Sequence, residues 1–140
     1  MKRGNIAVFA LLVVVAAMLL SGCYAAGGFS YKVSGCSERI YNSSAIGLKE
    51  ESVNVTLVSN SLMIMHNTNH FCSQKIAVDK IIHRNLITII EKFEGNEEEC
   101  MCQSKVEIAI NPLGKGQNKL TVLKQLSPEN IELEYEGEFR

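Results

Sequence analysis

The feature that most constrains the fold is a period-two alternation of apolar and polar residues, which begins after Glu51 and recurs to the end of the chain. Within residues 53–57, valine or leucine alternates with asparagine or threonine, and residues 106–110 and 131–139 repeat the pattern. Such alternation places the apolar side chains on one face of a strand. No segment past residue 24 sustains the 3.6-residue apolar period of an amphipathic helix, so the pattern predicts an all-β domain.

Turn-forming residues divide the alternating segments into short strands. The expected strands cover residues 31–33, 53–57, 62–65, 75–82, 86–90, 100–110, 120–123 and 131–139. Short polar connections join residues 53–57 to 62–65 and residues 75–82 to 86–90, and each of these pairs is predicted to form a hairpin. Residues 34–49 are expected to be irregular, and residues 131–139 to form a charged edge strand or a disordered acidic tail. Turns at intervals of roughly 8–12 residues favour a small antiparallel β-sandwich of about seven strands, formed by one domain over residues 31–140.

The first 22 residues have the layout of a secretory signal. Lys2 and Arg3 supply positive charge, residues 6–20 are uninterruptedly apolar, and small residues follow. The apolar stretch is shorter than the roughly 20 residues that span a bilayer, so a cleaved signal helix is favoured over a retained anchor. Both alternatives predict that the downstream domain is exported, because no second long apolar run follows it.

The end of this segment, Leu20-Ser21-Gly22-Cys23, resembles the lipobox of prokaryotic lipoproteins. The resemblance implies cleavage before Cys23 and lipidation of its sulfur, with residues 23–30 as a flexible, lipidated tether at the cell membrane. Cleavage also removes two of the 14 basic residues but none of the 15 acidic ones, so the mature net charge is −3. This charge argues against a nucleic-acid partner, which requires clustered lysine and arginine.

Four further cysteines remain once Cys23 is lipidated, at Cys36, Cys72, Cys100 and Cys102. An even number of thiols in an exported domain favours disulfides. Cys100 and Cys102 lie two apart on an expected strand, where a bridge between them would be strained. We therefore expect one bridge from Cys72 to either Cys100 or Cys102, with Cys36 bonded to the other.

The same thiols allow a second interpretation, a metal site. Cys72, Cys100 and Cys102 could supply thiolates, and His66 or His70 an imidazole. Three thiolates and one imidazole suit tetrahedral zinc or copper(I). The spacing matches no zinc finger or zinc ribbon, and both histidines fall in an Asn- and Thr-rich stretch that predicts a solvated loop. Disulfides are therefore favoured.

Catalytic motifs are lacking. Asp79 is the only aspartate, and the glutamates cluster at residues 97–99 and at alternate positions from 132 to 138. Such clusters are typical of solvated faces. There is no nucleophile elbow, HExxH motif or phosphate-binding glycine loop. His83 lies in an expected hairpin turn and is predicted to face solvent. We therefore expect no enzymatic activity and no cofactor.

A longer segment, roughly residues 62–124, resembles a family of small prokaryotic lipoprotein domains of uncharacterised activity. The resemblance rests on His66-Asn67, Phe71-Cys72, Ile87-Thr88-Ile89-Ile90-Glu91, Cys100-Met101-Cys102 and Pro112-Leu113-x-x-Gly116. It implies a β-sandwich and a lipoprotein, and it implies no activity. This chain has Phe71-Cys72-Ser73 where that family typically shows a cysteine pair.

These observations favour a membrane-anchored, extracytoplasmic lipoprotein that acts as a binding or structural module. Its ligand could be a protein, a glycan or a small molecule. The competing hypothesis is a metal-binding (zinc or copper) or thiol-redox lipoprotein that uses Cys72, Cys100 and Cys102.

Overall fold

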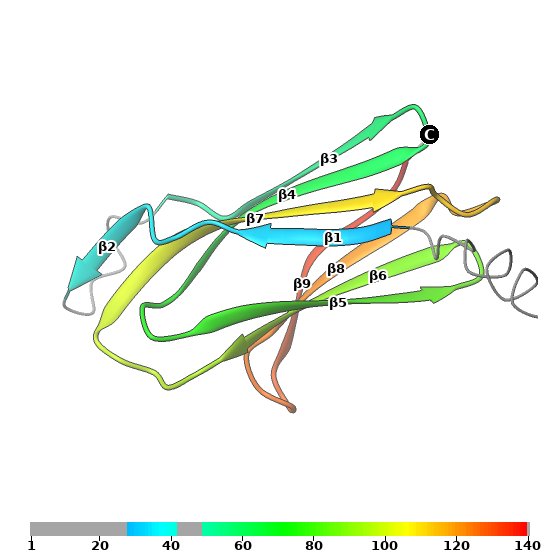
Figure 1. Cartoon of the computed structure of the whole chain (residues 1–140). Helices are drawn as coiled ribbons and strands as arrows, with labels where there is room; N and C mark the ends of the chain where they lie inside the picture. Colours follow the sequence, from blue (N-terminus) through cyan, green and yellow to red (C-terminus); the bar gives the residue numbers. More distant parts are fainter. Residues whose placement is uncertain (1–27, 42–48, 140) are drawn as a thin grey trace, which may run out of the picture.

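A computed structural model describes residues 28–41 and 49–139. The expected signal segment and Cys23 lie outside these residues. Within the described residues, nine strands form two sheets that pack face to face, which confirms the predicted all-β sandwich (Figure 1). Among the described residues, no helix is long and apolar enough to cross a membrane.

The first sheet is built around its longest strand. Its order is β1-β7-β4-β3, and β2 pairs with β7 on the edge that β1 also occupies. The strands are β1 (Gly28–Val33), β2 (Glu38–Tyr41), β3 (Ser52–Val58), β4 (Ser61–Phe71) and β7 (Cys100–Asn111). All pairs in this sheet are antiparallel. β7 pairs with three other strands, β1, β2 and β4, and so holds them in place.

The second sheet has the order β5-β6-β8-β9. Its strands are β5 (Lys75–His83), β6 (Leu86–Glu94), β8 (Lys119–Gln125) and β9 (Ile131–Glu138). β6 and β8 run parallel, because the chain crosses to β7 of the first sheet between them. β9 forms the edge, as one of the two alternatives for the acidic C-terminal segment predicted.

Both predicted hairpins are present and have two-residue turns, between β3 and β4 and between β5 and β6. Each turn begins with a residue of positive φ, Ser59 and Arg84, both at 55°. Positive φ at the first turn position gives the twist that two-residue hairpins require. His83 is exposed beside the second turn, as predicted.

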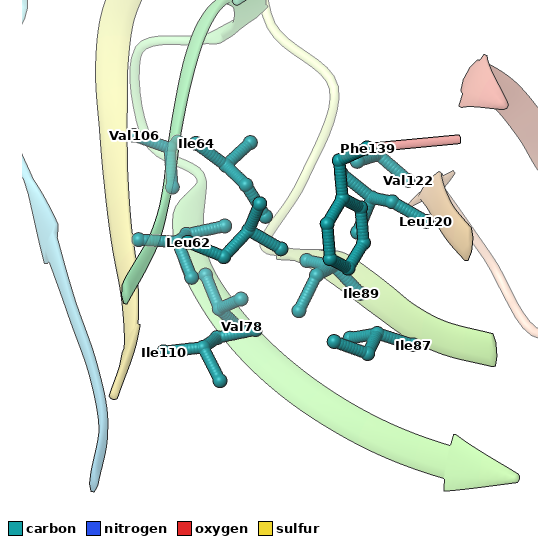
Figure 2. Close-up of a cluster of buried hydrophobic side chains, with 11 residues drawn as sticks. Leu62, Ile64, Val78, Ile87, Ile89, Val106, Ile110, Leu120, Val122 and Phe139 are labelled. Carbon is teal, nitrogen blue, oxygen red and sulfur yellow. The ribbon is translucent and has the colours of Figure 1, made fainter. Parts of the chain in front are cut away.

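The apolar core lies between the two sheets (Figure 2). It consists of every second residue of the central strands and one residue after β9: Leu62, Ile64, Val78, Ile87, Ile89, Val106, Ile108, Ile110, Leu120, Val122 and Phe139. Fully burying an aliphatic side chain of this size stabilises a fold by about 1.5–3 kcal/mol. Since these residues come from five strands in both sheets, their burial holds the layers together.

The predicted loop at residues 66–70 is wrong, because β4 continues through it to Phe71. β7 is long enough to pair with β4 from Ile110 to Met101, so the backbone groups of this polar stretch find ladder partners. The alternation also continues, with polar side chains in place of apolar ones. His66 and His70 point inward and are 0% and 7% exposed, rather than solvated.

One strand boundary and one additional strand also differ from the prediction. β1 begins at Gly28 instead of residue 31, so the last part of the expected tether is sheet. A Cβ at Gly28 would lie 2.9 Å from the carbonyl oxygen of Asn111, so glycine permits this close pairing. β2 lies within the segment expected to be irregular, where it pairs with the start of β7, beyond the residues that pair with β1.

Candidate functional site

Five ionisable side chains meet between the two sheets, where the interior changes from apolar to polar. We call them the inter-sheet cluster: Glu51, His66, Glu91, Lys124 and Glu134. His66 comes from β4 of the first sheet, whereas Glu91 and Lys124 are paired positions of β6 and β8 in the second. In each of these three strands, alternate residues point into the interior. The first two of these in β6 and β8, and the two before His66 in β4, are buried and apolar, and the next one is the charged or polar residue of the cluster. The period-two geometry of the strands therefore turns them into the interior.

The imidazole of His66 is fully buried and is oriented by Glu91. Its Nδ1 lies 2.8 Å from Oε2 of Glu91, and both side chains are 0% exposed. Nδ1–H donates to this carboxylate. The other ring nitrogen, Nε2, lies 3.7 Å from Oε2 of Glu134, and within the described residues it has no hydrogen-bond partner. One nitrogen is thus held in place while the other is presented to a carboxylate.

A β-bulge directs Glu134 toward His66. Val122 of β8 pairs with Tyr135, whereas the next residue, Leu123, pairs with Leu133, so Glu134 is the extra residue on β9. A bulge of this kind locally changes the direction in which a side chain points. Without the bulge, strict alternation in β9 would not place Glu134 beside a ring on the facing sheet.

Glu51 closes the cluster from the segment just before β3. Its Oε1 accepts hydrogen bonds from Lys124 Nζ and from the backbone N–H of Asn69, both at 2.6 Å, and from Thr68 Oγ1 at 3.3 Å. Burial opposes ionisation of Glu51, but the hydrogen bonds from Lys124 and Asn69 outweigh it and lower the pKa of Glu51. The carboxylate is therefore anchored in its ionised form.

Glu134 has the opposite electrostatic environment. Burial, followed by the neighbouring Glu51 carboxylate, raises the pKa of Glu134. Its side chain is 14% exposed, so the cluster reaches solvent on this side. A carboxylate that is destabilised by a nearby negative charge would be stabilised by any cation placed between the two.

The chemistry of the cluster follows from these positions. Donor atoms of Glu51, His66 and Glu134 all lie within 4.8 Å of one another. One imidazole nitrogen and two carboxylate oxygens are donor types that bind divalent transition metals. The same groups can also share protons, with His66 between Glu91 and Glu134.

The four downstream cysteines form two disulfides near one end of β7, which confirms the expected cross-linking. Cys36 is bonded to Cys102 and Cys72 to Cys100, with Cα–Cα distances of 5.5 and 5.4 Å. This is one of the two pairings that the sequence left open. Disulfide sulfurs do not offer thiolates, so in this form the three thiols of the alternative metal site are engaged elsewhere. The two disulfides are compatible with an extracytoplasmic location.

His70 lies near the disulfides but apart from His66. The two histidines are four residues apart on one strand, a separation of about 13 Å at strand geometry. His70 Nδ1 donates to the carbonyl of Phe71 at 2.8 Å, and Nε2 accepts from Ser104 Oγ at 2.9 Å. Burial lowers the pKa of His70, which favours the neutral ring. The candidate set of two histidines and three cysteines is therefore not brought together as one site.

Sequence reasoning missed four members of the inter-sheet cluster: Glu51, Glu91, Lys124 and Glu134. The sequence did contain a sign of Glu91 and Lys124. Each occupies the next inward-facing position after two apolar residues that alternate along its strand. The glutamates at residues 97–99 are exposed, as predicted. Glu134 was predicted to be solvated like the other glutamates of β9, but it is half-buried because of the bulge. The alternation of apolar and polar residues in the sequence gives no sign of this bulge.

No protein-family model, curated protein or solved structure matches this chain.

Proposed function

We propose that the protein is a lipid-anchored extracytoplasmic domain that acts as a binding module, with the inter-sheet cluster as its binding site. The observation that carries the binding role is the buried His66 imidazole, whose Nε2 faces a carboxylate without a hydrogen bond. Buried polar atoms almost always have a partner, and an exception calls for an explanation. A ligand atom at this position would supply the partner.

The lipid anchor is supported by the Leu20-Ser21-Gly22-Cys23 motif, and export is supported by the two disulfides. In a bacterial host that processes lipoproteins, we expect the wild-type chain to incorporate radiolabelled palmitate and the Cys23→Ser variant to lose the label. Protease added to cells whose outer membrane or cell wall has been permeabilised should digest the domain. Label that persists in Cys23→Ser, or a domain protected until the cells are lysed, would contradict the proposal.

The binding role is tested by thermal unfolding of the full chain in detergent against a panel of metal salts, inorganic anions, sugars and amines. A ligand that binds only the folded state raises the Tm, and at a fixed concentration a tighter ligand raises it more. At least one class is expected to raise the Tm of wild type but not of Glu134→Gln. If no compound raises the Tm, or if each compound raises the Tm of both proteins equally, the inter-sheet cluster is not the binding site.

A further inference from the structure

We propose that Glu51, His66 and Glu134 bind a divalent transition-metal cation, such as Zn²⁺, between the two sheets. This inference rests on the proposed binding role and names its ligand. The residues come from the segment before β3, from β4 and from the bulge of β9. A bound cation would therefore connect an edge of the first sheet to an edge of the second.

The donor geometry supports this site. Ligand atoms at about 2.0–2.2 Å from one zinc ion lie within about 4.4 Å of one another. The candidate donors of Glu51, His66 and Glu134 already lie within 4.8 Å of one another. The two glutamates have several side-chain torsions, so small rotations close this difference without moving the backbone. His66 is the rigid member, because packing and Glu91 hold its ring.

The hydrogen bond to Glu91 prepares His66 as a ligand. Metal-binding histidines almost always donate their second ring N–H to a carboxylate or carbonyl, which selects the tautomer and orients the ring. Here Nδ1–H donates to Glu91 Oε2 at 2.8 Å, so in the neutral ring the lone pair is on Nε2. That nitrogen is fully buried, lacks a hydrogen-bond partner within the described part of the chain, and points at Glu134. The cluster is therefore more than a group of acidic residues.

The charges in the cluster favour a dication. With ionised carboxylates and a neutral imidazole, three glutamates face a single ammonium, that of Lys124, which leaves a net charge of −2. Buried charge without compensation is costly. Lys124 is held by Glu51 Oε1 and by the carbonyl of Asn69 at 2.9 Å. It thereby leaves the second oxygen of Glu51 for the metal.

The donor set also selects the class of ion. A mixed set of one nitrogen and two oxygens suits zinc, manganese, iron or nickel, whereas calcium and magnesium prefer oxygen alone. Copper(I) prefers thiolates, and the cysteines of the described chain are in disulfides. Glu51 and Glu134 are 24% and 14% exposed, so the ion can enter and keep a water ligand on that side.

The test uses the full chain in detergent, with its disulfides intact and its metal removed by a chelator. Zinc chloride is titrated in competition with a chromophoric chelator, and cobalt(II) absorption reports a nitrogen and oxygen ligand set. Wild type is expected to bind one zinc ion per chain. Glu134→Gln should weaken zinc binding by more than about tenfold, and Glu91→Gln by roughly 10–100-fold through the loss of histidine orientation.

Glu136→Gln is the matched control, because it makes the same charge change two residues along β9 on the exposed face. It is expected to bind zinc as wild type does. Glu134 is partly exposed on an edge strand, so its conservative substitution should leave the fold intact, which circular dichroism verifies. Less than one zinc per chain at saturation, or equal weakening by Glu134→Gln and Glu136→Gln, would overturn the metal site. If zinc fails while another panel compound acts only through Glu134, the proposed function stands and the metal assignment falls.

Discussion

The interaction between His66 and Glu91 should dominate the stability of the inter-sheet cluster, and Glu91→Leu tests this. Both side chains are fully buried and 2.8 Å apart, so Glu91→Leu removes the acceptor of His66 Nδ1–H in a site that water does not reach. Leaving the N–H of a buried, neutral imidazole without its acceptor costs about 1–3 kcal/mol. Glu91 Oε1 itself has no hydrogen-bond partner in the described part of the chain, and its removal offsets part of the loss. We therefore expect Glu91→Leu to lower the free energy of unfolding by about 2 kcal/mol, the middle of that range.

Urea unfolding of the oxidised protein measures this effect. At a slope of about 2 kcal/mol/M, the urea midpoint should fall by roughly 1 M. The double variant His66→Leu/Glu91→Leu should recover most of the loss, since a buried pair can be replaced by apolar residues at little cost. Glu94→Leu, at the exposed end of the same strand, is the control and should change stability by less than about 0.5 kcal/mol. A Glu91→Leu cost below about 1 kcal/mol, or a double variant as unstable as the sum of its single variants, would refute the reasoning.

Three further predictions concern the rest of the fold. Removing the disulfides one at a time, as Cys36→Ala/Cys102→Ala and Cys72→Ala/Cys100→Ala, should each cost about 3–4 kcal/mol in urea unfolding. The first should cost more, because it closes 66 residues rather than 28, and the reverse order would contradict the loop-entropy account. Burial lowers the pKa of His70 below its ordinary 6.5, so its contribution to stability is present above about pH 6.5 and is lost as the pH falls toward the folded-state pKa. The urea midpoint of His70→Gln should therefore depend less on pH between about 5 and 7 than that of wild type, and parallel profiles would exclude this role. Ile108→Ala, at a fully buried core position, should cost about 2–5 kcal/mol, whereas Met65→Ala on the outer face should cost little, as unfolding midpoints will show.

How far the sequence predicts this structure depends on whether a pattern is local. The two hairpins, the long strand at Cys100 and the charged edge strand were all predictable, because period-two alternation and turn residues act over a few positions. β4 was predicted too short at His66, since the alternation there is carried by polar residues. β2 was missed because a four-residue strand forms only where a neighbour offers its backbone groups, and this neighbour is the start of β7, which β1 does not reach.

The cysteine chemistry shows the same division. The expected export and the four thiols besides Cys23 predict two disulfides, and strand geometry disfavours the Cys100–Cys102 bridge. The choice of Cys72 for Cys100 and of Cys36 for Cys102 depends on which segment passes beside each cysteine. That information exists only once β4, β7 and the β1–β2 connection are assembled.

The sequence by itself determined the all-β class, the core positions and the expected compartment, because alternation, turn chemistry and thiol number are properties of neighbouring residues. Only the tertiary structure decided the inter-sheet cluster. Its residues are spread from Glu51 to Glu134, and its geometry depends on the β9 bulge and on the packing of β4 over β6 and β8. The physical reason is that a buried charge becomes favourable or costly according to its partners, and these partners come from strands on both sheets.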